Sequence, residues 1–202
     1  DWSPKDESRK RSNSGSKCWF VPMIPASPVP PISSRCGSLN EEIRRILGPS
    51  GPFPPVLVLL GNPWRGDDAV GPFLADRLNG RLDPRCVLIT AFDRPEEAWE
   101  AVVPLRPRRV VMVDAADFGG RPGELRLTGP ETGETPPLST HRFPIEAVAR
   151  LIDRDTGADV HLLLVQVTNC RLGSPMSGEV RNAGEALAAF LEEVHARKSS
   201  GG

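Results

Sequence analysis

The chain has 202 residues, enough for one ordinary domain with a sizeable core and short for two. Its 25 Lys and Arg residues balance 26 Asp and Glu residues. The net charge of -1 provides no field for gathering nucleic acid or coating an anionic membrane. We therefore expect the partner to be a small molecule or another protein, with no nucleic acid and no membrane.

The four cysteines are scattered and form no C-x-x-C pair, which argues against a structural zinc site and against a dense disulfide framework. No stretch approaches the roughly 18 consecutive apolar residues of a membrane helix. The basic start is not followed by the apolar core of an export signal. These features predict a reducing, cytoplasmic setting.

The first part of the chain, residues 1–54, is rich in Ser and Pro and too polar to offset the entropy of ordering. We predict a disordered tail there, with LNEEIRRIL, residues 39–47, as a candidate short helix. The folded domain is predicted over residues 55–197, followed by a flexible C-terminus at 198–202.

Order is predicted to begin with VLVLL, residues 56–60, an unbroken apolar run typical of a strand buried on both faces. DDAVGPFLADRLNG, residues 67–80, then has the pattern of an amphipathic helix with acids in its first turn. The later predicted elements are strands at 85–91, 108–115, 124–129 and 160–167, and helices at 95–105, 144–152 and 177–198. This alternation predicts an α/β fold, a three-layer sandwich with a twisted, mostly parallel sheet of about five strands and helices on both faces.

In such a sheet the working surface lies beyond the carboxyl ends of the strands, where the strand order reverses. For the common order 2-1-3, the segment Gly61 to Gly71 faces Val113 to Asp117 there. The glycine spacing is that of neither a dinucleotide-binding loop nor a P-loop. Because Asp67 and Asp68 already place carboxylates at the helix start, this crevice suits a cation or a proton better than a phosphate.

Each of the three acids at this crevice has a structural alternative. Asp67 and Asp68 could equally serve as helix caps, since Asp is preferred at helix N-termini. For Asp114 a function is favoured. A carboxylate that closes the apolar run VVMV is a poor structural choice unless something pairs with it.

The three histidines differ in their sequence context. His195 lies at the end of the last helix, where a solvated surface residue is expected. His161 begins a buried strand, which favours a structural histidine. His141 follows a Pro-rich loop and precedes a helix, and we favour a functional role for it.

Two carboxylates and an imidazole make a ligand set with open positions, suited to a divalent first-row metal and not to a closed structural zinc site. Alternative nucleophiles are poorly supported. There is no G-x-S-x-G motif, and Ser139 and Thr140 have no evident base other than His141. Cys170, after the last strand, is interpreted as a passive loop residue.

Four sequence blocks together resemble the hydrogenase maturation proteases. GNPWRGDDAVG is similar to the family's G-N-x-x-x-x-D-[DE]-x-x-G signature. VDAADFGGRPGELR, STHRFP and PMSGEVRNAGEAL resemble the corresponding later blocks in the same order. The likeness spans about Val56 to Glu193 and is greatest to the branch that serves formate-hydrogenlyase-type hydrogenases.

The resemblance implies a hydrolase, classed in the family as an aspartic-type endopeptidase. It would remove the C-terminal extension of an immature [NiFe]-hydrogenase large subunit, and that precursor would be its partner. By the same resemblance Asp68, Asp114 and His141 would contact metal and carry the catalysis. The family needs no cofactor of its own, because the substrate presents the nickel.

The sequence departs from the family pattern at two places. Thr90, Ala91 and Phe92 stand where the family has D-G-G, a motif used in substrate recognition, and 167–169 replace a proline-bearing loop. Two other functions stay open from the residues alone. One is a metallohydrolase that holds its own metal on a similar sheet, and the other is a nickel-binding chaperone that docks the large subunit without cutting it.

Overall fold

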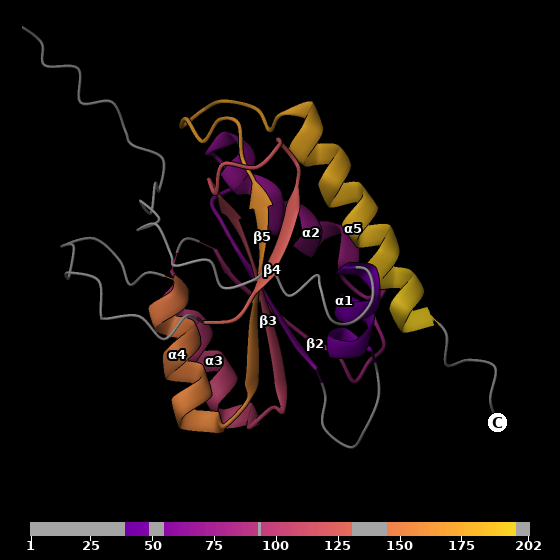
Figure 1. The fold of residues 1–202 in the computed structure, drawn as a ribbon, viewed down its shortest axis with the longest axis vertical. Coiled ribbons are helices and arrows are strands. Elements are labelled where there is room, and N and C mark those ends of the chain that lie inside the picture. The colour runs from indigo at the N-terminus through magenta and orange to yellow at the C-terminus, as the bar shows by residue number, and fades with distance from the viewer. Residues whose placement is uncertain (1–38, 49–54, 93, 131–144, 197–202) are drawn as a thin grey trace, which may run out of the picture.

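A computed structural model describes residues 39–48, 55–92, 94–130 and 145–196, and its centre is a five-stranded sheet in the order β2-β1-β3-β5-β4 (Figure 1). The strands are β1 (Val56–Leu60), β2 (Val87–Phe92), β3 (Arg109–Ala116), β4 (Leu125–Thr128) and β5 (Asp159–Gln166). β1, β2, β3 and β5 are parallel, and β4 runs antiparallel along the outer edge of β5. The predicted mostly parallel sheet and its 2-1-3 strand order are confirmed.

Helices cover both faces of this sheet, which confirms the three-layer α/β sandwich. They are α1 (Leu39–Leu47), α2 (Val70–Leu78), α3 (Pro95–Val102), α4 (Ile145–Thr156) and α5 (Gly178–Ala196), with short 3-10 segments η2 (Gly66–Ala69) and η3 (Val103–Leu105). α1, α2 and α5 contribute to the core on one face, and α3 and α4 to the core on the other. None of the described helices is both long and apolar enough to cross a membrane.

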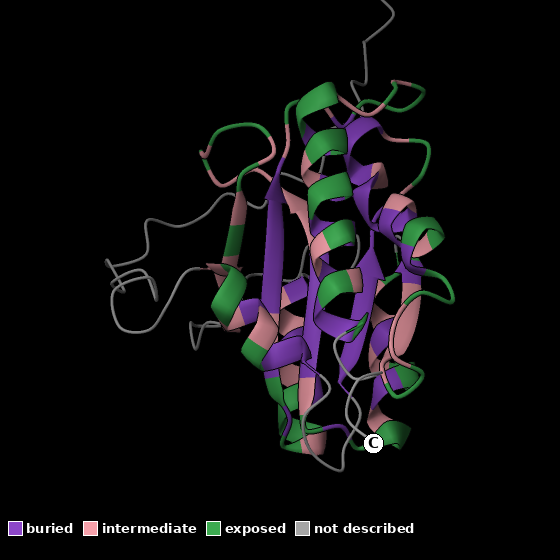
Figure 2. Cartoon of the chain, turned by 90° about the vertical axis from the view of Figure 1, so that its right-hand side faces the viewer, coloured by how far each residue is buried: buried purple, intermediate pink, exposed green. Residues whose placement is uncertain are grey.

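The unbroken apolar run of β1 follows from its central place in the sheet. Leu57 and Leu59 belong to the core under α2 and α5, whereas Val56, Val58 and Leu60 belong to the core under α3 and α4. Side chains of a strand alternate between the two faces, so a strand covered on both sides needs apolar residues at every position. The central strands are accordingly buried along their length (Figure 2).

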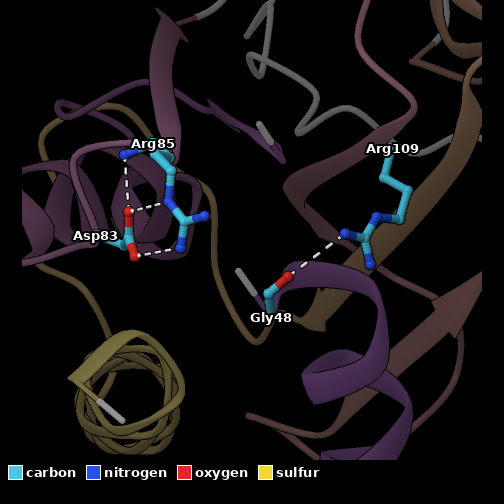
Figure 3. A network of polar contacts seen from close by, with 4 residues as sticks. All are labelled: Gly48, Asp83, Arg85 and Arg109. Atoms are coloured by element: carbon cyan, nitrogen blue, oxygen red, sulfur yellow. Dashed lines mark hydrogen bonds and ion pairs between the residues drawn. The ribbon is translucent and has the colours of Figure 1, made fainter. Parts of the chain in front are cut away.

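The candidate helix at 39–47 is present as α1, and it packs onto the core through its apolar side. Its buried side chains are Ile43, Ile46 and Leu47. The Arg109 guanidinium donates to the carbonyl oxygen of Gly48 at 3.4 Å (Figure 3). It also donates to the carbonyl oxygen of Arg45 at 2.6 Å, and the two bonds satisfy carbonyl groups at the helix end. The disorder predicted for the rest of 1–54 falls on residues outside those described.

The helix predicted at 67–80 differs at its start. Residues Gly66–Ala69 form a 3-10 turn, and the α-helix begins only at Val70. The Asp68 N–H donates to the Arg65 carbonyl at 3.1 Å, a tight i to i−3 bond, while the Asp67 N–H donates to Asn169 at 2.8 Å. The two acids therefore lie ahead of the α-helix, because the backbone of this turn bonds to a distant loop.

His195 was predicted to be a solvated surface residue, and that prediction is wrong. Its side chain is buried, at 6% exposure, although it lies one residue from the end of α5. Burial lowers the pKa of His195, and the charge of Asp83 opposes this shift only in part. The pattern of α5 indicated which side of the helix is apolar. It did not indicate that the turn before β2, which carries the Asp83–Arg85 ion pair (Figure 3), lies near the end of α5.

The lowered pKa of His195 makes the stability of the fold depend on pH. The unfolded chain binds a proton at the ordinary pKa of 6.5, whereas the folded chain resists protonation there. The free energy of unfolding should therefore fall as pH decreases from about 7.5 to about 5.5. His195→Leu should flatten this dependence in urea unfolding curves, and equal slopes in the two proteins would contradict the assignment.

Candidate active site

The carboxyl ends of β1 and β3 bring the first two predicted site residues to one edge of the sheet. Leu59 pairs with Val113, so Asp114 in the next position of β3 comes level with Leu60 at the end of β1. The turn η2, which carries Asp68, packs against β3. Asp68 and Asp114 thus lie on neighbouring elements at the edge where a ligand is expected in this fold.

Gly61 determines how closely η2 can approach the strand. Its φ is +127°, and a Cβ at this position would overlap the carbonyl oxygen of Asp68. The backbone of Asp68 therefore lies directly on the residue that follows β1. Only glycine permits both this backbone angle and this contact, which explains the first glycine of GNPWRGDD.

The Asp67 side chain has a structural role that the neighbouring Asp68 does not share. Its carboxylate is fully buried and accepts hydrogen bonds from the backbone N–H groups of Thr168, at 2.7 Å, Asn169, at 2.9 Å, and Ser177, at 2.6 Å. These residues are both ends of the β5 loop, which we define as residues 167–177. One carboxylate thus fixes both ends of that loop onto η2.

The electrostatics of Asp67 agree with this structural role. Burial alone would raise its pKa, but the hydrogen bonds from Ser177, Thr168 and Asn169 outweigh burial, and the pKa of Asp67 is lowered. Asp67 does not cap its own helix, since neither η2 nor α2 has a side-chain cap. The helix-cap alternative for this residue is therefore wrong, and it is nonetheless structural.

Gln166 fixes the loop that follows β3 in a similar way. Its side-chain oxygen accepts from the N–H groups of Phe118 and Gly120, each at 2.9 Å. Its side-chain nitrogen donates to Asp117 at 3.0 Å, and this bond, together with one from the Gly119 N–H, lowers the pKa of Asp117. The segment after Asp114 is therefore attached to the end of β5.

Of the three predicted site residues, two can be placed. Asp68 is buried, at 9% exposure, and Asp114 is half-buried, whereas His141 lies outside the described residues. Within the described part of the chain, no group of three or more His, Cys, Asp or Glu side chains could hold a metal ion. The three-residue ligand set therefore remains a prediction.

His161 and Cys170, two described residues for which the sequence predicts no chemical role, lie in and after β5. His161 is mostly buried in β5, and its Nε2 lies 3.0 Å from the Asp159 carboxylate, a position that fits the predicted structural histidine. Cys170 is buried at 5% exposure within the β5 loop, as expected for a passive residue. Ser139 and Thr140 lie outside the described residues.

Phe92, at the end of β2, has an unusual backbone. Its φ is +45°, and its side chain is 49% exposed. The pairing with β1 skips Ala91, so that Leu60 lies opposite Phe92, and the Phe92 carbonyl accepts from the Gly61 N–H at 2.8 Å. A bulky residue in the left-handed region is uncommon, and this is the position where the resembled family has its second D-G-G glycine.

The sequence contained a signal for Gln166 but little for the role of Asp67. A polar residue that closes the apolar run VHLLLV is the same signal that singled out Asp114, and it could have identified Gln166 as well. The hydrogen-bond partners of Asp67 lie 101 to 110 residues away in the chain. No local pattern predicts such a contact.

Known proteins resemble this chain in both sequence and fold. The family model HycI, hydrogenase maturation protease, matches residues 97–194. The hydrogenase 3 maturation protease of Escherichia coli K12 is 33% identical over 138 residues, which cover 68% of this chain and 88% of that protein. The family model extends over β3, the β5 loop and most of α5.

Two solved structures share the fold at similar identity. The [NiFe] hydrogenase maturation protease HycI from Thermococcus kodakarensis KOD1 superposes with a TM-score of 0.69 at 30% identity, covering 77% of this chain and 99% of that one. The endopeptidase HycI from Escherichia coli gives a TM-score of 0.61 at 30% identity, covering 70% and 90% of the two chains.

The three-layer α/β fold and these likenesses define a hydrolase of the peptidase class. The chain belongs to the hydrogenase maturation protease family, and its likeness to HycI proteins fits the formate-hydrogenlyase-type branch. Neither alternative, the metallohydrolase with its own metal or the non-cleaving chaperone, is favoured by these matches.

The hydrogen bonds to Asp67 predict a specific loss of stability in Asp67→Asn. An amide presents an NH₂ group to a pocket of N–H donors, so at least one buried donor loses its acceptor, at a cost of about 2 kcal/mol. Urea unfolding measures this, and Asp76→Asn on the exposed side of α2 is the matched control. Equal stabilities of the two variants would contradict the role of Asp67.

The direction of the Asp67 pKa shift adds a pH signature. Because the pKa is lowered, the stabilisation is complete above the ordinary value of 3.8 and is lost as pH falls through the lower folded value. The stability difference between the unaltered chain and Asp67→Asn should thus be constant near neutrality and shrink only in acid.

The left-handed backbone of Phe92 predicts that glycine is more stable than alanine at this position, the reverse of the usual order. Phe92→Gly should be more stable than Phe92→Ala by about 1 kcal/mol, because glycine adopts positive φ without the steric cost of a Cβ. At Leu105, which is also exposed and is not among the described positive-φ residues, the alanine variant should be the more stable one. Thermal unfolding of the four variants checks both orders.

Proposed function

We propose that this protein is an endopeptidase that recognises nickel in the immature large subunit of a [NiFe]-hydrogenase and removes the C-terminal extension of that subunit. Membership of the hydrogenase maturation protease family supports the reaction and the client. The single structural observation that supports the site is the position of Asp68 and Asp114 on neighbouring elements at the carboxyl edge of the sheet.

In this proposal Asp68 and Asp114 contribute carboxylate oxygens to the nickel of the client, and His141 contributes a ring nitrogen. Oxygen and nitrogen ligands with open positions suit a divalent first-row metal that keeps its other ligands in the client. The protein then needs no resident cofactor, because the metal arrives as part of the substrate. Its own side chains recognise the metal and hold the adjacent peptide bond at the edge of the sheet.

The aspartic-type class of the peptidase belongs to the same proposal. Hydrolysis of a peptide bond needs a group that accepts a proton from the attacking water. A carboxylate of Asp68 or Asp114 is the candidate for this step among the described residues at the edge. The backbone around Asp68 is fixed by its contact with Gly61, which favours a defined position for such a group.

We also place the protein in the cytoplasm. Under the proposed function the client carries its nickel before its extension is removed, so the protease must be in the same compartment as the immature subunit. Cys86 is a half-buried free cysteine among the described residues, and burial raises the pKa of its thiol to about 12. A protonated, enclosed thiol of this kind fits a reducing compartment.

The test is cleavage of a nickel-loaded large-subunit precursor, followed by the mass of the product. Asp68→Asn, Asp114→Asn and His141→Ala should each lower the cleavage rate by at least about 100-fold, because each loses a ligand or a proton acceptor. Asp76→Asn makes the same chemical change on the exposed side of α2 and should cut at the normal rate.

Two further controls separate this outcome from a folding defect. Each variant should unfold at nearly the temperature of the unaltered protein, and the nickel-free precursor should be left uncut by all of them. A site variant that still cuts at the normal rate eliminates the role given to that residue, and normal cutting of the nickel-free precursor eliminates recognition through nickel.

A further inference from the structure

The described part of the chain has four exposed large hydrophobic side chains, and they are unevenly distributed. Trp64, at 73%, and Leu172, at 67%, lie in the loops after β1 and β5, and Phe92, at 49%, ends β2. All three lie at the carboxyl edge of the sheet. Leu105, at 41%, lies just before β3 and hence at the opposite edge.

Trp64 and Leu172 lie on loops that are bonded to each other. The N–H of Gly173, the residue after Leu172, donates to the Trp64 carbonyl at 2.7 Å. The Gly66 N–H donates to the Ser174 carbonyl at 3.1 Å. Two segments more than 100 residues apart in the chain thus run side by side at the edge next to Asp68, where the loop after β5 folds over η2 (Figure 1).

This arrangement is fixed before any ligand arrives. The buried Asp67 carboxylate fastens both ends of the β5 loop, through Thr168 and Ser177. A Cβ on Gly66 would overlap the Asn169 carbonyl oxygen, so the two backbones are in direct contact. Trp64 and Leu172 therefore lose little backbone freedom on binding, which favours a docking surface over a pair of mobile side chains.

We propose that Trp64 and Leu172 form an apolar rim that docks the polypeptide of the client beside the bond to be cut, by covering apolar side chains of its C-terminal region. This inference rests on the proposed function, which supplies a protein substrate. The rim is continuous with the loop that carries Asp68, so a chain held there lies next to the acids. Exposed tryptophan is a frequent anchor of protein interfaces, and exposed apolar surface concentrated at one place marks an interaction site.

The experiment measures KM and kcat for cleavage of a nickel-loaded large-subunit precursor by the full chain. Trp64→Ala and Leu172→Ala should each raise KM about tenfold with little change in kcat, because they remove docking contacts and leave Asp68 and Asp114 in place. Leu172→Met and Trp64→Phe, which keep an apolar side chain, should restore most of the loss. Leu105→Ala, which truncates the exposed leucine at the opposite edge, is the matched control and should leave KM unchanged.

Unchanged KM values in both rim variants would overturn the proposal while leaving the peptidase function intact. A rise in KM for Leu105→Ala of the same size would also overturn it, since the effect would then not belong to this edge. The proposal would also be overturned if the rim served only to pair two copies of the chain. In that case the rim variants would change from dimer to monomer in light scattering, with KM unaltered.

A binding measurement keeps the docking proposal separate from the peptidase proposal. On an Asp68→Asn background, the dissociation constant for the same precursor should rise about tenfold with Trp64→Ala or Leu172→Ala and not with Leu105→Ala. If the unaltered chain cuts no precursor, the proposed function fails. The dissociation constants still show whether the precursor docks on the rim. Equal dissociation constants across the series would exclude docking on these side chains.

Discussion

The buried carboxylate of Asp67 joins two parts of the chain that are far apart in the sequence. A carboxylate without solvent is costly unless hydrogen bonds stabilise its charge, and here three backbone N–H groups do so. Those N–H groups lie in a loop, outside the regular hydrogen bonds of a helix or strand, and the carboxylate is their acceptor. The anion and the loop therefore stabilise each other, and the carboxyl edge acquires one defined shape.

The two adjacent acids of η2 lie in different environments. In a 3-10 turn successive side chains diverge by about 120°, so neighbours cannot share one environment. Asp67 is fully buried against the β5 loop, while Asp68 lies over the end of β1 with slight exposure. The sequence DD thus places one carboxylate in a structural role within the fold and leaves the other at the edge of the sheet, where the proposed function uses it.

The sequence predicted those features that depend on neighbours along the chain or on general rules of α/β sheets. The apolar run of β1 predicted a central strand, and the 2-1-3 order placed Asp114 beside the end of β1. Features that depend on distant contacts were missed or misjudged. His195 is buried and lies within the electrostatic reach of Asp83, more than 100 residues earlier in the chain, and the left-handed backbone of Phe92 coincides with an irregularity in its pairing with β1.

A site that is completed by the metal of its substrate places a particular demand on the fold. Under the proposed function, Asp68 and Asp114 must already lie at one edge of the sheet when the client arrives. No resident ion organises this edge under that proposal, because the ion belongs to the client. The backbone must then hold the edge by itself, through the contact of Gly61 with Asp68 and the bonds of Asp67 and Gln166. If the proposed function holds, an edge whose rigidity does not depend on metal presents the same carboxylates to every client, and a client that carries nickel completes the site.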